Sequence, residues 1–260
     1  MSLRKLAGLS RCALGLTLLC AAFPDASAHS EINLPPPYYV GEEFITAQYR
    51  IVHACTTNTG KSIPVIAQSF MLPTQNAVVS RPDGGKIDDS NGNGTADLED
   101  VIDNGNLAGL IQPFINRSVF QKIQRKTDSP DLDNAVGFSG TNGEVPDKFY
   151  ADMPFMLIPV SFRTDSCATE LIVHPVGADI CRITKSPKEG DANIWMEHTT
   201  AKFPNPVHGV GENALRISYK RNLKSLPLTK GCGKGYTVDV FASDEDIDAN
   251  LPIPGVWPKP

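Results

Sequence analysis

The sequence lacks an excess of basic residues. It has 24 Lys and Arg against 29 Asp and Glu, a formal net charge of −5 at pH 7. Proteins that bind nucleic acids or anionic lipid surfaces do so through a basic face, so we expect neither kind of partner. After residue 28 the sequence also lacks any run close to the about 20 apolar residues that a membrane-spanning helix requires, and we expect no membrane span.

Several signatures of catalysis are absent as well. The sequence contains no G-x-S-x-G, no P-loop, no H-E-x-x-H and no G-x-G-x-x-G after a predicted strand. It has no C-x-x-C, which argues against a zinc ribbon or a thioredoxin-type site. Aromatic residues make up only 7% of the chain, so the sequence predicts no flat aromatic surface for glycans.

What the chain does contain is many backbone breakers. With 21 Gly and 21 Pro, long helices are not expected and short strands joined by turns are favoured. We expect a single all-β sandwich domain over residues 29–260, with a short helix around Leu98–Gln112 and long polar insertions at about 83–142 and 185–212. The β-prone segments are 44–53, 63–72, 155–163, 169–175, 215–220 and 236–241.

Residues 1–28 are typical of a secretory signal peptide. Arg4 and Lys5 form the basic start, residues 13–22 form a short apolar stretch, and Ala26-Ser27-Ala28 forms an A-x-A cleavage site. The first 28 residues hold three basic side chains and one acidic one, so the mature chain carries 21 basic and 28 acidic side chains, a net charge of −7. We expect a periplasmic or secreted protein that begins at His29.

An amino-terminal histidine is a strong chelating ligand for copper. The α-amine and ring Nδ1 of His29 can bind one metal ion together, and copper is first in affinity among the common divalent ions for such nitrogen ligands. His53 lies at the end of the predicted strand 44–53 and stands close to Cys55 in the sequence. One amine and two imidazoles would form a three-nitrogen brace for Cu(II).

The mature chain has four cysteines, Cys55, Cys167, Cys181 and Cys232. An even number in an exported protein indicates two disulfides, for which three pairings are possible.

Residues 89–100 follow the register of an EF-hand calcium loop. Oxygen-bearing residues occur at loop positions 1, 3, 5, 7, 9 and 12, and Gly94 occupies position 6, where the chain must turn sharply. Asp at position 12 resembles dockerin-type loops. A single such loop predicts a structural calcium ion that holds the first insertion in place; the proposed ligands are Asp89, Asn91, Asn93, Thr95, Asp97 and Asp100.

Three segments together resemble the YcnI-like family of periplasmic copper-binding proteins. They are the Ala28-His29 cleavage point, the strand ending in Arg50-Ile51-Val52-His53-Ala54-Cys55, and Val145-Pro146-Asp147-Lys148-Phe149-Tyr150, which leads into an apolar strand ending in Cys167. The resemblance covers roughly 28–82 and 143–167.

The resemblance implies an immunoglobulin-like or cupredoxin-like β-sandwich. It also implies that His29 and His53 bind copper and that Cys55 pairs with Cys167, leaving Cys181 to pair with Cys232. A Trp near the copper in some family members has no counterpart within 155–162.

The second insertion offers a candidate second copper site. His198, His208 and Met196 could hold Cu(I), since a thioether is a soft ligand. Trp195 could instead cover the first copper site. A solvated loop without a metal is the alternative.

We therefore expect an exported copper-binding protein for copper capture, storage or delivery, with copper and calcium as cofactors and another copper-handling protein as a candidate partner. Two alternatives stay open. One is a copper-dependent polysaccharide monooxygenase-like enzyme, although His53 follows His29 unusually closely for that class. The other is a calcium-stabilised surface interaction protein.

Overall fold

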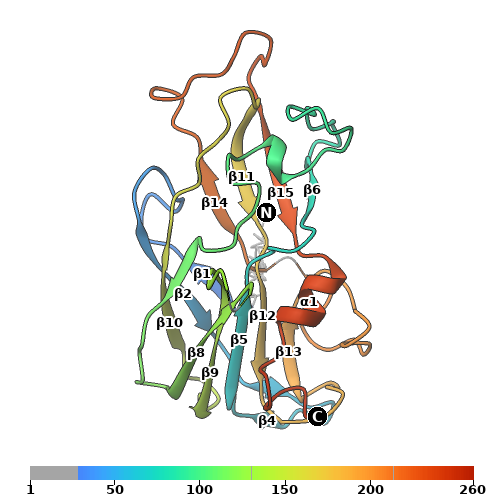
Figure 1. Cartoon of the computed structure of the whole chain (residues 1–260). Coiled ribbons are helices and arrows are strands. Elements are labelled where there is room, and N and C mark those ends of the chain that lie inside the picture. Colours follow the sequence, from blue (N-terminus) through green and yellow to red (C-terminus); the bar gives the residue numbers. More distant parts are fainter. Residues whose placement is uncertain (1–28, 130, 213) are drawn as a thin grey trace, which may run out of the picture.

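The computed structural model describes residues 29–129, 131–212 and 214–260. The predicted signal peptide, 1–28, lies outside the described residues. Nearly all regular secondary structure of the described chain is β-strand, which confirms the all-β class. Figure 1 shows an elongated molecule in which β6, β11, β14 and β15 lie toward one end and the remaining labelled strands toward the other.

Three sheets of four or five strands and one two-stranded ribbon carry the fold. The first sheet has the order β1 (Glu31–Asn33), β2 (Ile45–Ile51), β10 (Ala151–Leu157), β7 (Ile111–Pro113). The second has the order β14 (Ile217–Lys220), β11 (Ala168–Val173), β15 (Tyr236–Phe241), β6 (Val78–Ser80). The third has the order β13 (Ala192–Trp195), β12 (Val176–Ile180), β5 (Ala67–Met71), β9 (Ala135–Gly143), β8 (Phe120–Thr127), and the ribbon pairs β3 (Cys55–Thr56) with β4 (Ser62–Ile63).

The first and third sheets pack through an aromatic core. Phe70 of β5, Phe138 of β9 and Phe155 of β10 have ring centres 5.1–5.5 Å apart. On β10 buried residues alternate with half-buried ones, as expected for a strand with one face on the core. On β5 and β12 every residue is buried, so these central strands are covered on both faces.

The second face of the central strands is covered by the C-terminal region. The helix α1 (Asp244–Asn250) contributes Ile247 to an apolar cluster with Met71, Phe203 and Trp257. Ser243 caps the helix by accepting a hydrogen bond from the Asp246 amide at 3.2 Å. In Figure 1 this helix lies beside β12 and β13.

The helix predicted around Leu98–Gln112 is wrong. The structure has a short 3₁₀ turn, η1 (Leu98–Asp100), and the strand β7 begins at Ile111. Gly105 and Gly109 between them have positive φ values of 63° and 82°, which interrupt a right-handed helix. The predicted strands and helix also leave out α1 and the strands β1, β3, β6, β7, β8, β9, β12 and β13, among them the long pair β8 and β9.

The disulfide pairing implied by the family resemblance is wrong. All four mature cysteines are bonded, but Cys55 pairs with Cys181 and Cys167 pairs with Cys232. The reason is topological: β3 begins at Cys55 beside the end of β12, whereas Cys167 precedes β11, which belongs to the second sheet. Two disulfides are typical of a protein that folds in an oxidising compartment.

Within the described ranges, no helix is both long enough and apolar enough to cross a bilayer.

Candidate metal centre

Three histidines from distant parts of the chain converge beside one tryptophan. His29 precedes β1, His53 follows β2, and His208 lies in the loop after β13. The ring centre of His208 is 6.1 Å from that of His29 and 5.3 Å from that of His53. Trp195 meets all three imidazoles edge-on, with ring centres 5.3, 6.3 and 5.2 Å away.

The three imidazoles line a cavity of about 370 Å³, called here the histidine cavity. Its other lining residues are Ala54, Thr56, Asp147, Glu189 and Asn193. Among the lining residues that the structure describes, two are carboxylates and none is Lys or Arg. The charge of the walls therefore favours a cation over an anion.

The hydrogen bonds of His29 and His53 select which ring nitrogen can bind a metal. His29 Nε2 lies 2.5 Å from Glu212 Oε2, and His53 Nδ1 lies 2.6 Å from the Ala54 carbonyl oxygen. An N–H at each of these positions leaves the lone pair on the opposite nitrogen, Nδ1 of His29 and Nε2 of His53. Nδ1 is the ring nitrogen that chelates together with an α-amine.

His53 Nε2 is buried and has no hydrogen-bond partner. Asn193 Nδ2, in the wall of the same cavity, is also buried without a partner. Buried polar atoms in native proteins are nearly always satisfied. An orphaned imidazole nitrogen beside two further imidazoles fits a bound metal ion.

His208 favours its neutral form. Burial is the largest cause that lowers the pKa of His208 below its usual value, and the nearby His53 acts in the same direction. A neutral imidazole keeps the lone pair that a metal requires.

The described ranges contain no group of three or more His, Cys, Asp or Glu side chains that stands close enough together to hold a metal ion as it is. Two imidazoles on one ion, each bound at about 2 Å, have ring centres roughly 6 Å apart at most. The ring centre of His208 is 5.3 Å from that of His53, inside this limit, and 6.1 Å from that of His29, at the limit.

The residues of the candidate second copper site are placed in two different cavities. His208 lines the histidine cavity, whereas Met196 and His198 line a separate cavity with His174. Met196 is buried, and His198 Nε2 lies 2.7 Å from Asp244 Oδ1 at the surface.

The predicted calcium loop curls so that several side-chain oxygens accept hydrogen bonds from its own chain. Asp89 Oδ2 accepts from the Gly94 amide at 2.9 Å, and Asp100 Oδ1 accepts from the Asn91 amide at 2.8 Å. Asp97 accepts from the amide groups of the Asn91 and Asn93 side chains at 3.3 and 2.8 Å and caps η1. Gly94 has φ 84°, the left-handed conformation that position 6 requires.

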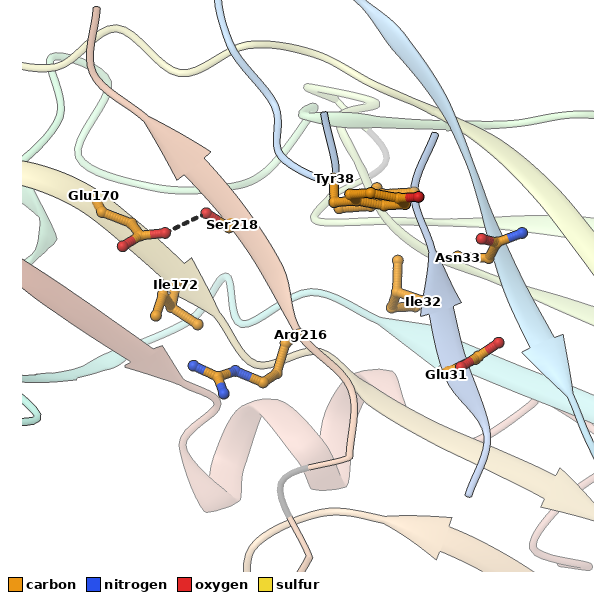
Figure 2. A pocket seen from close by; sticks show the side chains of 9 residues that line it. Glu31, Ile32, Asn33, Tyr38, Glu170, Ile172, Arg216 and Ser218 are labelled. Atoms are coloured by element: carbon orange, nitrogen blue, oxygen red, sulfur yellow. Dashed lines mark hydrogen bonds between the residues drawn. The ribbon is translucent and has the colours of Figure 1, made fainter. Parts of the chain in front are cut away.

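A further cavity of about 410 Å³ lies between β1 and the strands β11 and β14 (Figure 2). Its carboxylates are already engaged: Glu31 pairs with Arg50 at 3.3 Å, and Glu170 accepts a hydrogen bond from the Ser218 hydroxyl at 2.5 Å. None of its described lining residues is His, Cys or Met. It therefore offers none of the nitrogen or sulfur ligands that copper prefers.

Sequence reasoning missed two acidic residues of the site, Glu212 and Asp179. Glu212 lies in a polar stretch where nothing distinguishes it. Asp179 was detectable, since a single acid within the apolar segment Val176–Ile180 must be buried and therefore paired.

The comparisons with known proteins add little. No family model and no curated protein matches the chain. Among solved structures, it is similar to an uncharacterized protein from Nocardia farcinica whose crystal structure reveals an immunoglobulin-like fold. The TM-score is 0.35 at 9% sequence identity, covering 73% of this chain and 96% of that chain.

Proposed function

We propose that this protein is an exported copper-binding protein that captures, stores or delivers copper through an amino-terminal histidine brace. The observation that carries the proposal is the convergence of His29, His53 and His208 in one acidic cavity. The sequence alone predicts that only His29 and His53 bind the same ion, and it places His208 in a second candidate site. In the proposed site, His208 instead supplies a third imidazole to the first ion.

The proposed ligand set follows from the hydrogen bonds of the free protein. His29 would bind through its α-amine and Nδ1, with Nε2 held by Glu212. His53 would bind through Nε2, with Nδ1 held by the Ala54 carbonyl. Histidine ligands commonly use the second ring nitrogen in this way, which fixes the tautomer and the ring orientation. The α-amine is available only if cleavage follows Ala28.

Capture or delivery fits the surroundings of the cavity better than permanent burial. His29 is half-exposed, with 34% of its side chain accessible, so a bound ion could exchange with a partner. Asp147 and Glu189 at the wall would attract a cation during approach.

The test is Cu(II) titration of the exported chain, after mass spectrometry has identified its amino terminus. One tightly bound Cu(II) per chain with a nitrogen-rich paramagnetic resonance spectrum is expected. A chain that begins at His29 and binds no Cu(II) would leave the calcium-stabilised surface protein as the better account.

One observation favours the enzymatic alternative. Phe149 and Tyr150, in the loop of the cavity residue Asp147, are 63% and 74% exposed. Exposed aromatic rings beside a copper site could stack on sugar rings. If copper, a reductant and chitin or cellulose yield oxidised oligosaccharides, the protein is a polysaccharide monooxygenase-like enzyme and not solely a carrier.

We also propose one structural Ca²⁺ in the loop 89–100. Its support is the sequence register together with a loop that curls so that Asp89, Asp97 and Asp100 accept hydrogen bonds from N–H groups of the same loop. The ion would fix the segment between β6 and β7 and has no direct part in the copper chemistry.

A further inference from the structure

Asp179 of β12 is a fully buried carboxylate with three hydrogen-bond donors. Its Oδ2 accepts from the Ser30 hydroxyl at 2.6 Å and from Trp195 Nε1 at 3.0 Å. Its Oδ1 accepts from the Tyr49 hydroxyl at 2.9 Å. Ser30, Tyr49 and Trp195 are themselves almost wholly buried, so this cluster is part of the protein interior.

The donors suit an ionised carboxylate. A tryptophan N–H can only donate, and burial holds the pKa of Tyr49 well above its usual range, so its hydroxyl remains a donor. Burial also raises the pKa of Asp179, but the bonds from Ser30, Trp195 and Tyr49 oppose that effect. Among the described residues, no Lys or Arg is recorded in an ion pair with Asp179.

A glycine in β12 leaves the space that this cluster occupies. A Cβ atom at Gly177, two residues before Asp179, would lie 2.8 Å from the Tyr49 hydroxyl oxygen and 2.7 Å from a ring carbon. Both distances are shorter than real Cβ contacts. Glycine at this position therefore allows Tyr49 to reach the carboxylate.

The cluster lies directly behind the proposed copper ligands. Ser30 is the residue after His29, and Trp195 is the ring against which all three imidazoles pack. Immediately after β12, Cys181 forms a disulfide with Cys55, and this bridge holds the segment that carries His53.

The third histidine is fixed through the neighbouring strand. The amide of Ile194, in β13, donates a hydrogen bond of 2.8 Å to the carbonyl oxygen of His208. Because β13 pairs with β12, the strand that carries Asp179, each of the three histidines is linked to β12 through one or two intervening residues.

We propose that Asp179 is the positioning residue of the amino-terminal histidine: by holding Ser30 and Trp195, it sets where the amine and ring of His29 stand relative to His53 and His208. This inference rests on the proposed function. A short amino-terminal segment would otherwise fray, and a frayed chelate must be ordered again at each binding event, which lowers affinity. Replacing residues that orient metal ligands typically costs about 10–100-fold in metal affinity.

The test compares two variants that each remove one hydroxyl from the same carboxylate. Ser30→Ala removes the bond that holds the His29 segment, whereas Tyr49→Phe removes a bond on the other carboxylate oxygen. For Ser30→Ala we expect the Cu(II) dissociation constant to rise about 10–100-fold, with a changed paramagnetic resonance spectrum. For Tyr49→Phe we expect a dissociation constant within about twofold of the native value and an unchanged spectrum, although thermal unfolding should show a destabilisation comparable to that of Ser30→Ala. Ser30→Thr, which keeps a hydroxyl, should restore the native behaviour.

A second readout needs no copper. Amide hydrogen exchange of 31–33 in the metal-free chain should be faster in Ser30→Ala than in Tyr49→Phe. Equal copper affinity, spectrum and exchange in these two variants would overturn the role of Asp179. If the exchange differs but the native chain binds no Cu(II), the anchoring by Asp179 stands and the copper function falls.

Discussion

The two proposed metal sites of this protein are built in opposite ways. The calcium loop takes all its proposed ligands from twelve consecutive residues, 89–100, which turn back on themselves at Gly94. The histidine cavity takes its proposed ligands from positions 29, 53 and 208, and their approach depends on β12, β13 and a disulfide of sequence separation 126.

This difference determines how each site should respond to damage elsewhere in the molecule. A contiguous loop can keep its register when distant packing is disturbed, because its geometry is mostly local. The histidine cavity should lose its geometry whenever the strands or the bridge behind it are disturbed. The predictions below separate the two sites on this basis.

The largest effect is expected from the two disulfides, which lie in different parts of the molecule. Replacing either pair by serines should destabilise the protein by about 2–5 kcal/mol, as measured by urea unfolding. Only loss of Cys55–Cys181 should also weaken Cu(II) binding strongly, because that bridge holds the His53 segment. Loss of Cys167–Cys232 is the matched control, and equal copper affinity in the two variants would contradict the account.

Single histidine replacements should rank the ligands. His53→Ala and His208→Ala should each weaken Cu(II) binding by about 10–100-fold, at least as much as loss of an orienting residue. His198→Ala should have little effect, since His198 faces Asp244 outside the histidine cavity. Isothermal titration of the three variants checks this order, and a dominant effect of His198 would move the copper site to the other cavity.

The sequence alone suggests every residue of the proposed contiguous site but only some residues of the proposed dispersed one. The loop register and the His29 chelate are visible in the sequence because each depends on local spacing. The partnership of His208 with His29, the disulfide pairing and the role of Asp179 depend on which strands pair. The strand pairing could not be predicted from the sequence, because β8, β9 and β13 lie in stretches where polar residues and glycines obscure the alternating pattern of a strand.

Calcium should stabilise the protein by a moderate amount. A ligand that binds only the folded state at 100 times its dissociation constant contributes about 2.7 kcal/mol, or roughly 5–10 °C in melting temperature for a domain of this size. Differential scanning calorimetry of chelator-treated protein with and without Ca²⁺ measures this shift. Asp89→Ala should abolish the shift while leaving the copper affinity unchanged, and an unshifted native protein would show that the loop is only a turn.

The smallest effect concerns pH. Unfolded histidine gains a proton near pH 6.5, whereas burial lowers the pKa of His208 in the folded protein. Below about pH 6.5 the unfolded state therefore binds more protons, and stability is lost as the pH falls toward the folded pKa of His208. Urea unfolding of the metal-free chain at pH 7.5 and 5.5 should show a smaller loss for His208→Gln than for the native protein. An identical loss would show that His208 does not contribute to it.

The most direct test of the copper brace is to keep Ala28 in front of His29. This change preserves every side chain of the histidine cavity and removes only the free α-amine from His29. Cu(II) affinity should fall by at least the roughly 100-fold that marks the upper range for losing an orienting residue, and the paramagnetic resonance spectrum should change. Undiminished affinity with an unchanged spectrum would contradict the brace and show that the imidazoles alone hold the metal.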